Sequence, residues 1–129
     1  MATEIDGLGA WKPKDKGGID DKELWNLDMT FSEFILPRLK EFKNMKRAGY
    51  PEIEGIDPNT EQKTVEAWEG ILDDIIKGFE SHIRYATNSF LEGTENENSE
   101  GIKRKEDEHK MAIEKGFELF GRHYMNLWD

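Results

Sequence analysis

The chain has 129 residues, a suitable length for one domain with its own hydrophobic core. It contains no cysteine, so disulfide frameworks, Cys-based zinc sites and catalytic thiols are excluded. Its net charge of −10 disfavours contact with nucleic acid and anionic membranes, and no apolar run reaches the roughly 18 residues of a membrane-spanning helix. We therefore expect a soluble, cytoplasmic domain without a signal peptide.

Residues 1–24 are predicted to form a flexible N-terminal arm. They are rich in Gly, Lys and Asp, and they contain Pro13 and a Gly17-Gly18 pair, which favour turns over regular structure. The remaining residues, 25–129, are predicted to form a single helical domain.

A first helix is predicted over residues 29–47, where apolar residues recur at three- and four-residue steps. Thr30 and Glu33 have the spacing of a capping box at its start. Pro37 lies inside this pattern and cannot donate the backbone hydrogen bond to the carbonyl of Glu33, so we expect a kink there. A turn-rich connector containing prolines and glycines follows over residues 48–60.

Two longer helices are predicted in the second half of the chain. The first spans residues 60–91 and has the strongest apolar periodicity, and the second spans residues 102–127. The acidic loop between them, residues 92–101, is short, so the two helices should pair as an antiparallel hairpin.

The hairpin register follows from the equal rise of the two helices. It places Phe79 near Gly116, where a large ring would fill the notch left by a glycine inside a helix, and it places His82 near His109. The expected fold class is all-α: an antiparallel three-helix domain in which the kinked first helix covers the hairpin. An apolar edge left over on these helices would also support a homodimer.

One cationic segment stands out in this acidic protein. Residues 25–50 contain five basic and three acidic side chains, a net charge of +2. Two interpretations remain open: the cations complement the dipole at the helix C-terminus, or they bind an anionic ligand such as a nucleotide or an acidic partner surface. The candidate binding residues are Arg38, Lys40, Lys43, Lys46 and Arg47.

A metal site is a further hypothesis. Glu106 and His109 have the Glu-x-x-His spacing that binds iron or manganese in ferritin-like bundles, and the hairpin register would bring His82 nearby. A complete site of that type needs a second motif and two more glutamates, which only a symmetric dimer would supply. The alternative is two half-buried histidines hydrogen-bonded to a carboxylate.

Other catalytic patterns are missing from the sequence. Glu66-x-x-Glu69 lacks the downstream Glu-x-x-Asp of all-α nucleotide pyrophosphohydrolases, the serines lie in no recognisable catalytic setting, and no glycine-rich phosphate loop occurs. Asp73-Asp74 is interpreted either as a solvated acidic face or as an acidic docking surface. We therefore expect no enzymatic activity and no cofactor.

Several segments occur in the order Trp25-Asn26-Leu27-Asp28-x-Thr30, Phe34-Ile35-Leu36-Pro37-Arg38-Leu39, Gly49-Tyr50-Pro51, Trp68-x-x-Ile71-Leu72 and Leu119-Phe120-Gly121. This pattern, across residues 25–129, resembles a family of small proteins encoded by tailed bacteriophages. The resemblance implies no activity and no catalytic residue. It does imply a context: a small acidic protein in the cytoplasm of an infected bacterium, where it acts by binding.

The sequence therefore predicts a non-enzymatic binding protein that acts on a host protein or a defence component. Two alternatives remain. One is a protein that sequesters an anionic, nucleotide-like ligand against Arg38 and Lys43. The other is a metal-binding helical protein that uses His82, Glu106 and His109.

Overall fold

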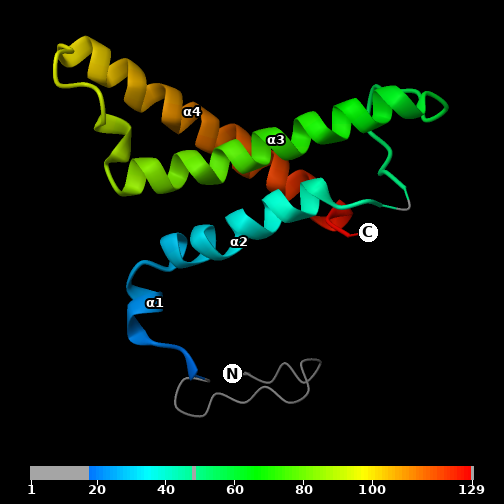
Figure 1. Ribbon diagram of the computed structural model, residues 1–129, viewed down its shortest axis with the longest axis horizontal. Coiled ribbons are helices and arrows are strands. Elements are labelled where there is room, and N and C mark those ends of the chain that lie inside the picture. Colours follow the sequence, from blue (N-terminus) through cyan, green and yellow to red (C-terminus); the bar gives the residue numbers. More distant parts are fainter. Residues whose placement is uncertain (1–17, 48, 129) are drawn as a thin grey trace.

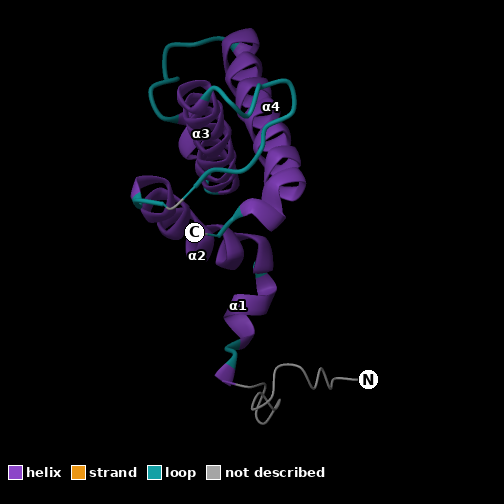
Figure 2. Cartoon of the chain, turned by 90° about the vertical axis from the view of Figure 1, so that its right-hand side faces the viewer, coloured by secondary structure: helices purple, strands orange, loops and turns teal. Residues whose placement is uncertain are grey.

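The computed structural model describes residues 18–47 and 49–128, and within these ranges it contains helices but no strand (Figures 1 and 2). The prediction of an all-α fold is confirmed. None of the described helices is both long and apolar enough to span a membrane. The elements are α1 (Asp21–Trp25), α2 (Leu27–Asn44), α3 (Glu61–Ala86), the 3-10 helix η3 (Ser89–Leu91), α4 (Ser99–His123) and the 3-10 helix η4 (Tyr124–Asn126).

The long helix α3 is the centre of the fold and packs against both α2 and α4 (Figure 2). Its buried side chains, Trp68, Leu72, Ile75 and Phe79, follow one another at three- and four-residue steps and therefore lie on one side of the helix. Leu39 of α2 is buried against this side. The core is thus built around the apolar stripe of α3.

Helices α3 and α4 cross at a pair of glycines, where their backbones touch (Figure 1). A Cβ atom on Gly116 would lie 2.6 Å from the Cα of Gly78 and 2.8 Å from the carbonyl oxygen of Asp74. We expected the ring of Phe79 to fill the notch at Gly116. Instead the backbone of Gly78 fills it, because Phe79 lies one residue further along α3 and packs against the ring of Phe117.

The helix boundaries differ from the predicted ones at several ends. Helix α2 begins at Leu27, ends at Asn44 and continues through Pro37. Helix α1 begins inside the predicted arm and ends one residue beyond it, at Trp25, and none of its residues is buried. A capping box holds its start, where the Asp20 carboxylate accepts from the Lys22 amide at 2.8 Å and Glu23 accepts from the Asp20 amide at 2.9 Å.

Thr30, which was expected to cap the first long helix, instead donates to the carbonyl of Glu23 at 2.9 Å. This hydrogen bond ties the start of α2 to α1. Residues 1–17 of the predicted arm lie outside the described part of the chain.

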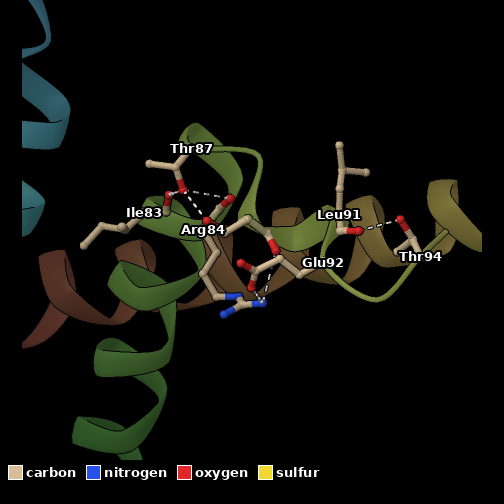
Figure 3. A network of polar contacts seen from close by, with 7 residues as sticks. Ile83, Arg84, Thr87, Leu91, Glu92 and Thr94 are labelled. Carbon is tan, nitrogen blue, oxygen red and sulfur yellow. Dashed lines mark hydrogen bonds and ion pairs between the residues drawn. The ribbon is translucent and has the colours of Figure 1, made fainter.

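The connection from α3 to α4 is a series of hydrogen-bonded turns (Figure 3). The hydroxyl of Thr87 donates to the carbonyl of Ile83 at 2.8 Å, and that of Thr94 donates to the carbonyl of Leu91 at 2.6 Å. Arg84 lies 3.7 Å from the carboxylate of Glu92. Helix α3 ends at Ala86 rather than at residue 91, and α4 begins at Ser99 rather than at residue 102, so the connection starts and ends earlier in the chain than predicted.

Phe90 anchors this connection from within η3. It is buried and packs between the rings of Tyr85 and His109, at 5.4 and 5.8 Å between centroids. Helix α4 then begins at Ser99, where the side chain of Asn98 accepts from the Gly101 amide at 2.9 Å.

Candidate functional site

Aromatic rings from three helices meet in one cluster. Phe79 of α3 lies at its base, only 3% exposed, and contacts Phe31 of α2 at 6.0 Å between centroids. It also contacts Phe117 and Phe120 of α4, at 4.8 and 5.2 Å. Phe31 and Phe120 meet edge-on at 6.2 Å, so the cluster bridges α2 and α4.

The outward side of this cluster is exposed. Phe31 and Phe117 remain partly in solvent, and the stripes that they belong to continue with more exposed residues, such as Phe34 at 52% and Tyr124 at 60%. The ring of Tyr124, in η4, contacts Phe120 at 5.6 Å, which continues the surface from α4 onto η4. The surface, here called the aromatic face, comprises Leu27, Phe31, Phe34, Phe117 and Tyr124.

The spacing of these residues explains why they share one surface. Leu27, Phe31 and Phe34 lie four and three residues apart on one side of α2, and Tyr124, the first residue of η4, follows Phe117 of α4 by seven residues. Single exposed apolar side chains are common, whereas a contiguous set of them marks an interaction site. Sequence analysis recognised Phe31 and Phe34 as an apolar stripe but assigned that stripe to the core.

Arg38 lies on this surface rather than in a basic patch. Its guanidinium carbon is 3.8 Å from the centroid of the Phe34 ring, and its Nη1 donates to the Phe34 carbonyl at 2.7 Å. Arg38 therefore covers one side of the ring by a cation–π contact.

The other predicted cationic residues do not gather at one site. Lys40 forms an ion pair with Glu80 at 3.0 Å, and Lys43 forms a hydrogen-bonded ion pair with Asp73. Both pairs join α2 to α3, so the cationic segment complements the acidic helix beside it. An anionic ligand would have to compete with these internal carboxylates.

Lys46 and Arg47 lie beyond the end of α2, which stops at Asn44 and not at the predicted residue 47, so they are not on the helix that carries Lys43. Lys46 is exposed. Arg47 turns back over the ring of Phe42, with its guanidinium carbon 4.3 Å from the centroid, and donates to the Phe42 carbonyl. It thereby satisfies a carbonyl at the end of the helix.

The three residues of the predicted metal site have separate partners. Glu106 lies beside the hydroxyl of Tyr85, which donates to it at 3.3 Å. The Nδ1 atom of His109 is hydrogen-bonded to the Lys105 carbonyl at 2.9 Å. His82 is directed toward α2 instead of toward His109. Among the described residues, no group of three or more His, Asp or Glu side chains could hold a metal ion.

His82 belongs to a hydrogen-bonded network that sequence analysis missed. Its Nδ1 lies 2.8 Å from the hydroxyl of Ser32, and its Nε2 lies 2.8 Å from the carboxylate of Asp28. The hydrogen bond from His82 lowers the pKa of the Asp28 carboxyl below its usual value. Because both partners come from α2, this network fastens α2 to α3.

The composition of the network is that of a Ser-His-Asp triad, but its burial is reversed. A nucleophilic hydroxyl must face the substrate, whereas Ser32 is 2% exposed and the carboxylate of Asp28 is the solvent-facing end. The geometry therefore supports a structural role. One feature of the sequence could have indicated this network: Ser32 and His82 lie on the inner sides of their helices, where buried polar groups require hydrogen-bond partners.

The aromatic face is thus the surface of the described chain with the clearest capacity to bind. Comparison with known proteins adds no assignment to it: the chain matches no protein-family model, no curated protein and no solved structure. The resemblance to phage proteins stays a prediction, and a function has to be argued from this surface.

Proposed function

We propose that this protein is a non-enzymatic binding domain that docks a protein partner through the aromatic face. One observation carries the proposal: Phe31, Phe117 and Tyr124, between 38% and 60% exposed, are linked ring to ring through Phe79 and Phe120, and the exposed Leu27 and Phe34 lie on the same side of α2 as Phe31. Contiguous exposed apolar residues of this kind are enriched at the centres of protein interfaces.

The energetic argument is straightforward. An aromatic side chain covers about 200 Å², so burying the exposed half of one ring would gain roughly 2.5 kcal/mol at 25 cal/mol per Å². The four rings of the face would together gain about 10 kcal/mol, which is comparable with the roughly 4–15 kcal/mol cost of association, so polar contacts around them have to supply the remaining affinity. Phe31 and Phe117 are also held in position by Phe79 beneath them, so these two rings would lose little side-chain entropy on binding.

We further propose that α2, α3 and α4 act as one antiparallel three-helix domain, with α2 bent at Pro37. The paired contacts along α3 and α4 support this arrangement: Trp68 meets His123 toward one end, and Tyr85 meets Glu106 toward the other. A bend at Pro37 would orient Leu27, Phe31 and Phe34 relative to α4.

The proposed biological setting is an infected bacterium, in whose cytoplasm a phage-encoded protein acts on a host protein or a defence component. The order of motifs across residues 25–129 supports this setting. The net charge of −10 favours a partner with a basic surface.

Affinity capture from bacterial lysate, with quantitative mass spectrometry, tests the proposal. Phe34→Ser removes an exposed ring from the aromatic face. Met111→Ser is the matched control, because Met111 is 70% exposed on α4 but lies on another side of that helix. We expect Phe34→Ser to lose a partner that wild type and Met111→Ser retain. Equal capture by all three proteins would contradict the proposal.

A further inference from the structure

We propose that the aromatic face binds an amphipathic helix whose apolar stripe is flanked by basic residues. This inference rests on the proposed function and specifies the partner. It makes two separate statements about that partner: that it is helical, and that it is cationic.

The packing of the three long helices favours a helical partner. Both α2 and α4 pack on α3, yet their own backbones do not come within 8 Å of one another. At the aromatic face the two helices are connected through their side chains, by the contact of Phe31 with Phe120. A further helix placed against both would complete a four-helix arrangement opposite α3.

The dimensions of the face agree with such an occupant. Leu27 and Phe34, like Phe117 and Tyr124, are seven positions apart, which is about 10 Å along a helix axis. Two facing stripes of this length match the contact made by two turns of a helix with apolar residues at positions i, i+3, i+4 and i+7.

The charges bordering the face favour a cationic partner. On α2, Asp28 lies next to Leu27 with a largely exposed carboxylate, and the exposed Glu41 lies seven residues after Phe34. On α4, the exposed Glu114 and Glu118 lie one turn apart along the same flank of Phe117. Asp28 is engaged by His82 and Glu118 by Arg122, whereas no ion pair engages Glu41 or Glu114 among the described residues; the cations Arg38 and Lys110 are themselves held, by the Phe34 ring and by Glu106.

The same charges disfavour a second copy of this chain as the occupant. Two molecules that each carry a net charge of −10 repel one another, and a symmetric contact would bring the acidic borders together. A basic helix instead places its flanking lysines or arginines against the carboxylates while its apolar stripe covers the rings.

Three designed helical peptides test the inference against the full-length protein by isothermal titration calorimetry. Each peptide is about 18 residues, roughly 27 Å as a helix, and carries the same Leu/Phe stripe. Their flanking residues are Lys, Gln or Glu. The proteins are wild type, the double variant Phe34→Ser/Tyr124→Ser and the control Met111→Ser, each checked for folding by circular dichroism.

We expect the Lys peptide to bind wild type and Met111→Ser equally, and to bind the double variant at least about tenfold more weakly. The Glu peptide should bind wild type at least about tenfold more weakly than the Lys peptide, and the difference should shrink as salt is added.

The remaining outcomes overturn the inference in distinguishable ways. If all three peptides bind wild type with equal affinity and the double variant weakens each of them, the statement that the partner is cationic is wrong, while the proposed function still stands. Lys-peptide binding that is unchanged in the double variant would mean a non-specific charge attraction and would remove the site. A wild-type dimer in sedimentation equilibrium that dissociates in the double variant would assign the face to a second copy.

Discussion

At Gly78 and Gly116, the absence of a methyl group decides how closely α3 and α4 can approach. A Cβ on either residue would lie under 3 Å from backbone atoms of the opposite helix, and backbone cannot move aside as the end of a side chain can. Alanine at either position would therefore force the two helices apart. The close crossing depends on both glycines.

We predict that Gly116→Ala lowers the free energy of unfolding by about 1–3 kcal/mol, the usual cost of overpacking. The control is Gly121→Ala, also on α4, where a Cβ meets nothing within 4 Å. That change should raise stability by up to about 1 kcal/mol, because alanine favours helix over glycine. Urea unfolding followed by circular dichroism measures the stability of both variants. Equal stabilities for Gly116→Ala and Gly121→Ala would contradict the close contact of the two backbones at Gly116.

The hydrogen bond between Asp28 and His82 predicts a pH dependence. The pKa of Asp28 is lowered in the folded protein, mainly by the hydrogen bond from His82, relative to its usual value of 3.8. Its contribution to stability is therefore fully present above the usual pKa and is lost as the pH falls through the folded pKa. The carboxylate is largely exposed, so the contribution is small.

Comparison of wild type with Asp28→Asn in urea, at about pH 6 and at about pH 2, isolates this contribution. We expect wild type to be the more stable protein at the higher pH and the advantage to shrink at the lower pH. An advantage that is independent of pH would show that the ionised carboxylate is not the stabilising form.

At the scale of the element, α2 is held on α3 by a small apolar contact and by polar pairs along its sides. Leu39 is buried in the core, whereas both partners of the Lys40–Glu80 pair are about half exposed. Exposed ion pairs contribute about 0–1 kcal/mol, because solvent screens them. The apolar contact should therefore dominate the docking of α2.

We predict that Leu39→Ala costs about 2–5 kcal/mol of stability and that Lys40→Ala costs less than about 1 kcal/mol. Thermal unfolding of the two variants beside wild type gives the comparison. A larger loss for Lys40→Ala than for Leu39→Ala would mean that the ion pairs, and not the core, hold α2 in place.

The elements that could be predicted from the sequence were those with a buried stripe. Periodicity located the three long helices because each turns apolar residues toward a neighbour. It missed α1, which buries none of its residues and leaves no such pattern, although its capping box at Asp20 and Glu23 was present in the sequence. The hairpin register differed by one residue, since Gly78 rather than Phe79 meets Gly116.

The candidate site could be predicted only in part. The apolar stripe of α2 was visible, but whether its rings are buried depends on how many helices surround them, and periodicity does not report that number. The Ser32–His82–Asp28 network joins residues 50 or more positions apart, so no local spacing could indicate it. The cations of α2 were visible too, whereas their pairing with Glu80 and Asp73 needed the helix packing.

At the scale of the whole molecule, the proposal gives charge and apolar surface separate functions. A net charge of −10 would attract a basic partner over a distance, and the aromatic face would supply the area that holds that partner once bound. Substitutions on the face should therefore accelerate dissociation, whereas added salt should slow association.

The most direct measurement places a photo-cross-linking phenylalanine analogue at Phe34 or at Met111 of the protein expressed in bacterial cells. Both side chains are exposed, so the analogue should be tolerated at either position. The account predicts that irradiation yields a discrete cross-linked product with another protein from position 34 and none from position 111. The same products from both positions, or no product from position 34, would contradict it.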